Sequence, residues 1–346
     1  MSLPASRQPG INRSDWRGQA RALLRFLPGV LVTAVAVWFL VRAVDWGQFV
    51  ATLASIPAWI LVLNVAIYLM SMVVRALCWQ TLLQRKVSPG RAVLAMNEGY
   101  FLNNILPLRL GELGRAVLLG RRSKLGTFHV LSTIVVERSY DMAIAAGLLL
   151  LVLPLVLQME WARPVALLLL VVILAGLVAL FLAARYRTWL EARLVTWAER
   201  WRLIRWILPV VRSLLDGFSV LTRFEFFALS FGLLALSWTM AIFRDWALIQ
   251  QLAPGAPLWW AVLAISAANL GGALPSAAAS LGVFEAAAVT ALTLVGVAPE
   301  AGLAYALIVH VTHLISSSLI GVYALSQEGK SLSDVIAELR SAAPKR

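Results

Sequence analysis

The sequence has few of the residues that soluble enzymes and disulfide-bonded proteins depend on. Its 346 residues include a single cysteine, Cys78, and three histidines, and only 14% of them are Asp, Glu, Lys or Arg. One cysteine excludes an intrachain disulfide and a metal site built from cysteines. Soluble domains average about a quarter charged residues, so the scarcity of charge argues against a soluble fold.

Apolar residues take the place of the missing charge. Hydrophobic residues make up 61% of the chain, and the mean hydropathy is +0.83. These values predict an all-α polytopic membrane protein, because a helix satisfies its own backbone hydrogen bonds inside a bilayer. The net charge of +13 would suit a nucleic-acid partner in a soluble protein. Here the basic residues flank the apolar runs, so we interpret them as cytoplasmic flanks and contacts with anionic lipid.

Six apolar runs are expected to be full transmembrane helices. They lie at about 26–41, 59–83, 129–157, 164–184, 226–249 and 303–325. Basic residues cluster at 85–91, 121–124 and 185–212, which the positive-inside rule places in the cytoplasm. We therefore expect both termini inside, with residues 1–24 forming a basic tail and 326–346 a second tail. Residues 25–325 would form the transmembrane domain.

Residues 185–223 differ in composition from the runs on either side. Arginine and tryptophan alternate there, a pattern that predicts basic amphipathic helices lying in the inner membrane interface. The alternating residues are Arg185, Arg187, Arg193, Arg200, Arg202, Arg205 and Arg212 with Trp189, Trp197, Trp201 and Trp206. An RNA-binding interpretation of the same pattern is the weaker one.

Residues 103–115 form a polar stretch between two apolar segments. The stretch is too short to cross a bilayer, and broken backbone survives at membrane depth only when it is buried in protein or lines a wet cavity. We therefore predict a re-entrant helical hairpin over about residues 92–119 that turns here. It would enter and leave the membrane on the cytoplasmic side. Its candidate site residues are Asn103, Asn104, Pro107, Arg109, Gly111, Glu112 and Arg115.

A second broken element resembles the first. It contains Asn269, Leu274-Pro275, Gly282 and Glu285, in the same order as the Asn, Leu-Pro, Gly and Glu of the first stretch. Little basic charge flanks it, so we expect this element to enter and leave the membrane on the outer side. We therefore predict two inverted-topology repeats, at about 57–157 and 224–325. Such folds place their site near the bilayer midplane, where broken helices of both halves meet.

Three motifs together resemble a known family. They are Asn104-Ile-Leu-Pro-x-Arg-x-Gly-Glu-x-x-Arg115, Val-Glu137-Arg138-x-x-Asp141, and Leu-Pro275 followed by Gly282-Val-x-Glu285. Together they look like the transmembrane flippase domain of lysylphosphatidylglycerol synthases, over roughly residues 25–325. The resemblance implies a bacterial inner-membrane protein that moves or handles a lipid. No soluble aminoacyl-transferase domain follows residue 326, so we expect a stand-alone relative that does not itself synthesise lipid.

Further ionisable residues lie within the apolar segments. Such residues are expensive in a membrane and usually face an interior cavity. Glu137 and Asp141 share a helix face, and Arg138 lies three residues before Asp141. These three are candidate head-group residues, and an internal salt-bridge network that locks the helices together is the weaker alternative. Secondary candidates are Arg75, Glu98, Arg244, His310 and His313.

Two of the secondary candidates also have simpler interpretations. Arg244 would reach the outer surface by extending its long side chain. His310 and His313 lie one turn apart, and a structural pair is favoured over a switch that titrates near neutral pH. Two histidines without a third ligand are poor support for a metal site, so we expect neither metal nor cofactor.

Head-group recognition is the function these residues favour. Arginine binds phosphate through two parallel hydrogen bonds and stays charged, and helix N-termini add further donors. We therefore expect translocation of a phospholipid or lipid-phosphate head group through a polar midplane cavity. Three alternatives stay open: a membrane transferase acting on a lipid-linked substrate, a carrier of small solutes or ions, and a non-catalytic partner of a lipid-synthesis enzyme.

Overall fold

The structure, a computed structural model, describes residues 27–106, 110–156, 162–273, 278–327, 329 and 332–342. All regular elements within these ranges are helices, as the apolar composition predicted. Several predicted features lie outside the described residues: the basic tail 1–24, the turn residues Pro107 and Arg109 of the first hairpin, and Leu274-Pro275 of the second.

Four of the six predicted spans are single helices long and apolar enough to cross a membrane. They are α4 (Ala58–Leu82), α7 (Thr127–Val156), α11 (Phe224–Leu252) and α14 (Pro299–Gln327). The first and fourth predicted spans correspond to α2 (Leu27–Ala43) and α8 (Ala162–Arg185). Helix α2 has 17 residues and joins α3 (Trp46–Ala54) at a sharp bend, and α8 has 24 residues and joins α9 (Arg187–Arg200) at another. Each bent pair counts as one possible span. The fold is therefore a multi-pass membrane protein with four to six spans.

Two pairs of shorter helices occupy the places of the predicted broken elements. The first pair is α5 (Pro89–Ile105) and α6 (Leu110–Arg122). The second is α12 (Leu258–Gly272) and α13 (Val283–Thr293), preceded by the short helix η3 (Ala278–Ser280). At about 1.5 Å per residue, each is shorter than the roughly 30 Å hydrocarbon core of a bilayer. Whether each pair enters and leaves the membrane on one side stays a prediction.

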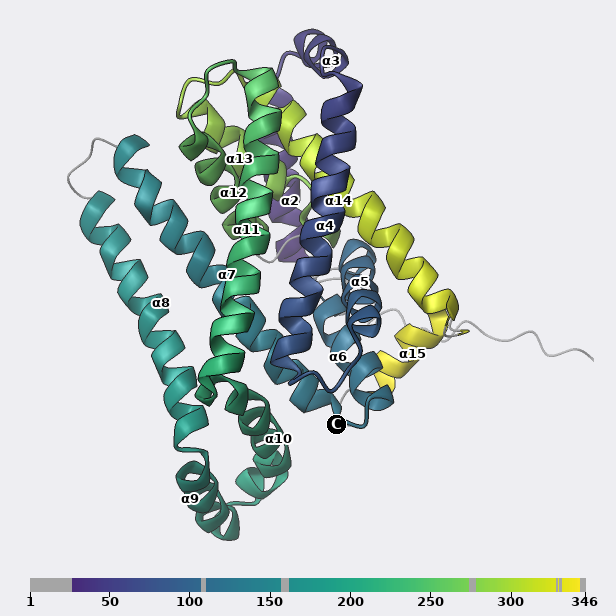
Figure 1. Ribbon diagram of the computed structural model, residues 1–346, viewed down its shortest axis with the longest axis vertical. Coiled ribbons are helices and arrows are strands. Elements are labelled where there is room, and N and C mark those ends of the chain that lie inside the picture. Colours follow the sequence, from purple (N-terminus) through teal and green to yellow (C-terminus); the bar gives the residue numbers. More distant parts are fainter. Residues whose placement is uncertain are drawn as a thin grey trace, which may run out of the picture.

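The long and short helices pack in a reciprocal pattern (Figure 1). Helix α4 packs along α11. The first half of this centre is α4 to α7, and the second half is α11 to α14. The first short helix of each half packs against the last long helix of the other half: α5 lies against α14, and α12 lies against α7. The helix lengths also repeat in the order long, short, short, long. Helices α4 to α7 have 25, 17, 13 and 30 residues, and helices α11 to α14 have 29, 15, 11 and 29 residues.

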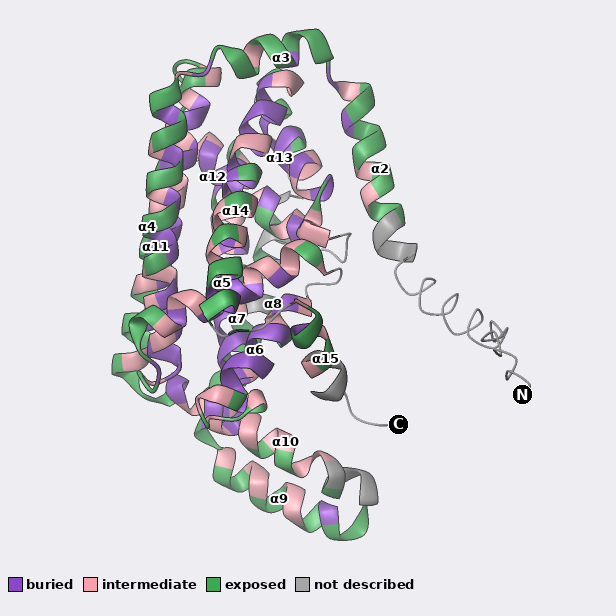
Figure 2. Cartoon of the chain, turned by 90° about the vertical axis from the view of Figure 1, so that its right-hand side faces the viewer, coloured by how far each residue is buried: buried purple, intermediate pink, exposed green. Residues whose placement is uncertain are grey.

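The remaining helices surround this centre. Helices α9 and α10 (Arg202–Phe218) lie together at the lower end of the molecule in Figure 1, and α10 also packs against α7 and α8. The C-terminal helix α15 (Leu332–Ala342) packs on α6. Helix α2 stands at the side, reached through α3, and much of its surface is exposed (Figure 2). Exposed leucine, valine and phenylalanine side chains on α4, α8, α11 and α14 give the outside an apolar surface suited to lipid.

A hydrogen bond holds the first short pair together close to its turn. The backbone N–H of Gly111 on α6 donates to Oδ1 of Asn103 on α5 at 2.8 Å. A side chain at position 111 would collide with the α5 backbone at Gly99 and Asn103. The absence of a side chain at Gly111 is therefore what lets the two helices approach so closely, and it places Asn103 and Glu112 at the centre of the molecule.

Candidate functional site

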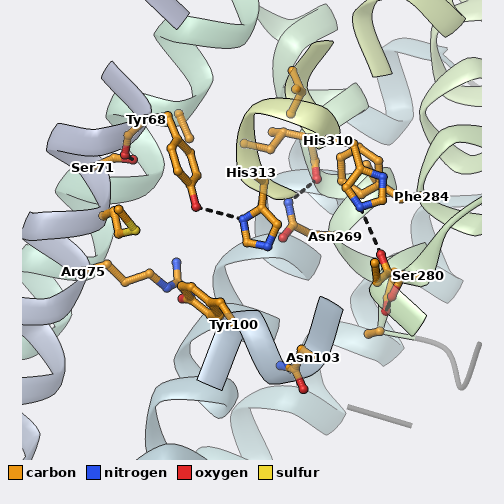
Figure 3. A pocket seen from close by; sticks show the side chains of 18 of the residues that line it. Tyr68, Ser71, Arg75, Tyr100, Asn103, Asn269, Ser280, Phe284, His310 and His313 are labelled. Atoms are coloured by element: carbon orange, nitrogen blue, oxygen red, sulfur yellow. Dashed lines mark hydrogen bonds between the residues drawn. The ribbon is translucent and has the colours of Figure 1, made fainter. Parts of the chain in front are cut away.

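A cavity of about 390 Å³ lies between the two halves of the protein (Figure 3). Its lining comes from both sets of long and short helices. Helices α4 and α5 contribute Tyr68, Ser71, Tyr100 and Asn104, and the opposite half contributes Trp238, Asn269, Ser280, Phe284 and Val309. Polar groups from the short and the long helices thus meet at one cavity. Its position at the midplane of the bilayer stays a prediction.

The charged residues of the lining are mostly cations. Three guanidinium groups face the cavity, those of Arg75, Arg138 and Arg244, together with the imidazoles of His310 and His313. Among the described lining residues, the carboxylate is that of Glu112. Four buried acids near the cavity contact these cations without lining it; they are Glu137, Asp141, Asp245 and Glu285.

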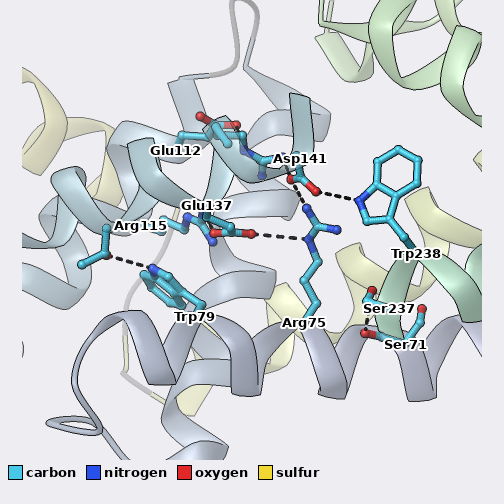
Figure 4. A network of polar contacts seen from close by, with 11 residues as sticks. Ser71, Arg75, Trp79, Glu112, Arg115, Glu137, Asp141, Ser237 and Trp238 are labelled. Carbon is cyan, nitrogen blue, oxygen red and sulfur yellow. Dashed lines mark hydrogen bonds and ion pairs between the residues drawn. The ribbon is translucent and has the colours of Figure 1, made fainter. Parts of the chain in front are cut away.

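Asp141 joins three helices (Figure 4). Arg75 of α4 donates to its carboxylate, and Arg138 lies 3.1 Å from the same oxygen. The indole N–H of Trp238 on α11 donates to the other oxygen at 3.0 Å. Since these partners come from α4, α7 and α11, the Asp141 carboxylate holds both arginines in fixed positions at the cavity wall.

Helix α6, the second helix of the first short pair, is connected to α7 by two ion pairs. Nε of Arg138 lies 2.8 Å from Glu112, at the cavity surface. Nη2 of Arg115 donates to Glu137 at 2.7 Å, and its guanidinium lies over the ring of Trp79, 4.5 Å from the ring centre. Arg115 and Glu137 are buried and do not line the cavity. The first pair therefore can meet a ligand, while the second lies behind the wall.

Arg244 is buried, so it does not extend to the outer surface as the simpler interpretation proposed. Only 7% of the residue is exposed, because its guanidinium pairs with the neighbouring Asp245 at 2.6 Å. Tyr305 of α14 donates to the other oxygen of Asp245 at 2.9 Å. This arrangement turns Arg244 inward, where it contributes to the cavity lining.

The second hairpin has its own charged contact. Glu285 lies in the first turn of α13, where it accepts a hydrogen bond from the backbone N–H of Gly282 at 2.7 Å. Its other oxygen lies 2.5 Å from Nδ1 of His310 on α14. Gly282 has a φ of 81°, in the left-handed region that favours glycine. Helices α6 and α13 are thus each connected to the long helix that follows, α7 and α14 respectively, by a contact between a carboxylate and a basic group.

Further hydrogen bonds fix the remaining predicted polar residues. Asn104 donates to the hydroxyls of Ser317 and Ser318 at 3.0 Å each, across the contact of α5 with α14. His313 bonds through Nδ1 to the hydroxyl of Tyr68 at 3.0 Å. Asn269 donates to the carbonyl of Ile265, one turn back on α12. His310 and His313 therefore have different partners and do not form a pair with each other.

The structure divides the predicted site residues into two groups. The first group lines the cavity: Asn103, Asn104, Glu112, Arg138 and Asn269, with the secondary candidates Arg75, Arg244, His310 and His313. The second group supports it from behind: Arg115, Glu137, Asp141 and Glu285. Glu98 lies buried at the base of the first hairpin, 3.6 Å from Nη1 of Arg122, away from the cavity. Gly111 and Gly282 shape the backbone.

Four polar aromatic residues near the cavity were not expected from the sequence. Tyr68, Tyr100 and Trp238 line the cavity, and Tyr305 holds Asp245. Their only signal in the sequence is a polar aromatic ring inside an apolar helix, which is common in membrane proteins. Asp245, next to Arg244, carried a clearer signal, because an intramembrane acid is rare. Within the described part of the chain, no cluster of three or more His, Cys, Asp or Glu side chains could hold a metal ion.

Residues 26–321 match the family described as the lysylphosphatidylglycerol synthase TM region. The match covers most of the chain and all the helices that line the cavity, and it confirms the resemblance seen in the three motifs. No curated protein and no solved structure matches the chain.

Proposed function

The chain belongs to the lysylphosphatidylglycerol synthase TM family, and we propose that it translocates a lipid whose phosphate head group enters the central cavity. Family membership indicates a membrane lipid-related function. The finer steps, which are the anionic head group and its movement across the bilayer, are our proposal. The acyl tails stay in the bilayer while the head group passes between the two halves.

The observation that best supports the proposal is that three arginine side chains face the cavity. Arg75, Arg138 and Arg244 face the cavity, while the acids that neutralise Arg75 and Arg244 lie behind the lining. Each guanidinium has five N–H donors, and its contacts with carboxylates use only some of them. The remaining donors are available to phosphate oxygens, which arginine binds with matched geometry.

The packing of the helices supports an inverted repeat. If the fold consists of two equivalent halves, a contact between two helices should recur between their counterparts. The contact of α5 with α14 corresponds to that of α12 with α7, and α4 packs on its own counterpart α11. Short helices that end at a polar cavity also suit re-entrant hairpins, because broken backbone at membrane depth must face protein or water. Alternating access would then move one half against the other around the cavity.

The setting we propose is the bacterial inner membrane with both termini in the cytoplasm. Membrane lipids are the partners, and anionic or phosphate-bearing lipids are the ones the guanidinium groups suit. A lipid-synthesis enzyme that delivers the lipid would be a further partner, which co-purification of the full-length chain tests. No cofactor enters the proposal.

The test is lipid movement in vesicles that contain the purified protein. Fluorescently tagged phosphatidylglycerol is placed in both leaflets, and a membrane-impermeant reductant bleaches the outer one. Wild-type protein should give a second, slower loss of fluorescence as inner lipid moves outward. Arg138→Ala should remove this phase, and Arg138→Lys should restore part of it, because lysine keeps the charge but loses the planar fork. Glu112→Gln should change the rate while keeping the shape of the side chain.

Two controls make the result specific. Arg193→Ala removes an exposed arginine from α9, far from the cavity, and should leave lipid movement unchanged. Thermal stability in detergent is measured for every variant. Folded wild-type protein that moves no tagged lipid, or Arg138→Ala that moves it at the normal rate, would contradict the proposal.

A further inference from the structure

The imidazole ring of His310 joins α14 to two parts of the second hairpin, and Figure 3 shows the ring beside Phe284 and Ser280. Nδ1 lies 2.5 Å from Oε1 of Glu285 in α13, and Nε2 lies 3.0 Å from the carbonyl oxygen of Ala279 in η3. The ring of Phe284 covers one face of the imidazole, 4.7 Å away between ring centres. His310 is thus the link between the hairpin and the long helix that follows it.

Both contacts of the ring exist only when one extra proton is present. The carbonyl oxygen of Ala279 can only accept, so Nε2 must carry a hydrogen and donate it. The contact between Nδ1 and Glu285 then needs a second hydrogen, which either the ring or the carboxyl group carries. If that proton leaves, a neutral imidazole has a single N–H to offer to two acceptors. A lone pair then faces a lone pair at one contact, and the hairpin loses one of its two attachments.

Glu285 differs in this respect from the other acids around the cavity. Four of them contact an arginine: Glu112 with Arg138, Glu137 with Arg115, Asp141 with Arg75, and Asp245 with Arg244. Arginine stays protonated in proteins, so the charge of those contacts is fixed. Glu285 instead contacts a histidine, the side chain whose charge changes most readily near neutral pH. Among these five acids of the described residues, Glu285 is the one whose basic partner is a histidine and not an arginine.

The groups around the ring have other partners. His313 lies one turn along α14 and bonds to Tyr68 of α4. Tyr100 of α5 contacts the ring of His313. Arg244, Arg75 and Arg138 face the same cavity from α11, α4 and α7, and each is paired with an acid. Since these groups already have partners, the proton that His310 and Glu285 share is not shared with a third side chain of the described residues.

The backbone next to the ring is held in an unfavourable conformation. Ala279 and Ser280 have φ values of 58° and 57°, in the left-handed region that residues with a side chain rarely adopt. Such conformations persist only where the surrounding contacts impose them. The contact from Nε2 to the Ala279 carbonyl is one of those contacts, so its loss would let this segment move.

We propose that His310 and Glu285 form a proton-binding site that latches the second hairpin to α14. With the proton bound, the ring holds both η3 and α13, and the pair is neutral overall. With the proton lost, the segment at Ala279 and Ser280 detaches and the pair carries a negative charge. The coupling of this latch to transport rests on the proposed function: an anionic head group in the cavity favours the protonated, neutral pair, so lipid and proton bind together.

The test follows the position of the latch without using lipid. The full-length chain carries Cys78→Ala and Ser280→Cys, and the rate of maleimide labelling is measured in detergent from pH 5 to 9. Each rate is divided by that of free cysteine at the same pH. The normalised rate should rise at least tenfold with pH as the latch opens. His310→Gln should give a fast rate at every pH, because its amide does not bridge both acceptors.

Glu285→Gln sharpens the test because it should act in the opposite direction. Its amide N–H₂ donates to Nδ1 without any added proton, so labelling should stay slow at every pH. His129→Gln is the matched control, since His129 is a buried histidine that does not line the cavity; it should keep the wild-type response. A wild-type rate that does not change with pH, or a rise that persists in Glu285→Gln, would overturn the latch.

A second measurement separates the latch from the transport proposal. Phosphatidylglycerol added to the labelling reaction should shift the midpoint of the rise to higher pH, and phosphatidylcholine should not. An unshifted midpoint would overturn the coupling to the head group. Because the labelling without lipid needs no transport, the latch stands or falls independently of the vesicle experiment.

Discussion

Arg115 Nη2 and Glu137 Oε2 lie 2.7 Å apart, with both side chains buried behind the wall of the cavity. The pair connects α6, the second helix of the first hairpin, to α7. Removal of one partner from a buried ion pair typically costs about 3–5 kcal/mol. Among the described residues, Glu137 would keep only the longer contact to Nε of Arg75, at 3.4 Å. We therefore expect Arg115→Ala to lower the melting temperature strongly in detergent, and to lower lipid movement only in proportion to the loss of folded protein.

The control for Arg115→Ala is Arg138→Ala, measured by the same two assays. Arg138 faces the cavity, and a quarter of its side chain is exposed, so its loss should reduce lipid movement more than stability. If Arg115→Ala were as stable as wild type but inactive, Arg115 would have a direct role in lipid movement that its position behind the wall does not explain.

Gly111 provides a test of the close contact inside the first hairpin. Gly111→Ala places a methyl group against the backbone of Gly99 and Asn103 on α5, which cannot move aside as a flexible side chain would. Overpacking of this kind typically costs about 1–3 kcal/mol. The matched control is Gly232→Ala on α11, where the added methyl group meets nothing within 4 Å. That variant should be neutral or gain up to about 1 kcal/mol, because alanine favours a helix more than glycine does. Equal melting temperatures for the two variants would contradict the close contact.

The topology can be tested with single cysteines in a Cys78→Ala background. Helix α15 packs on α6, so the C-terminal helix and the basic cluster at 121–124 lie at the same end of the molecule. The start of α14 lies at the other end of a 29-residue helix. A cysteine at Ser123 should therefore react with an impermeant reagent from the cytoplasmic side, and one at Ala298 from the opposite side. Labelling of both positions from the same side would show that the predicted orientation is wrong.

The arginine- and tryptophan-rich segment 185–223 should bind anionic membranes. In the structure it forms α9 and α10, joined by an ion pair of 2.6 Å between Arg187 and Asp216. A peptide of this segment should gain helical circular dichroism on vesicles rich in phosphatidylglycerol and much less on phosphatidylcholine vesicles. High salt should weaken the effect, because it screens the attraction between arginine and anionic lipid. Equal helicity on both kinds of vesicle would remove the electrostatic part of this prediction.

The helical class, the family and most polar residues of the cavity followed from local sequence. A helix repeats its faces every three to four residues, so Glu137 and Asp141 were expected on one side of α7, and both lie close to Arg75. The two broken elements were recognisable because glycine, proline and charge interrupt an apolar run. Their re-entrant course depends on the membrane boundary and stays a prediction.

The assignment of individual side chains to the cavity needed the tertiary structure. Arg115 and Arg138 look equivalent in the sequence, but Trp79 and Glu137 enclose the first while the second remains at the surface of the cavity. Arg244 was given an outer position because it lies near the end of an apolar run. Asp245 and Tyr305, the latter 60 residues further along the chain, hold it inside.

The reciprocal placement of α5 on α14 and of α12 on α7 also bears on how such a chain is assembled during synthesis. When α4 to α7 leave the ribosome, the groove of α7 that α12 will occupy is still empty, and α5 has no α14 to receive the amide of Asn104. Neither half can complete its interior until the other half has been inserted. The polar contacts of the first half, such as that of Asn104, therefore stay incomplete until the second half has been made.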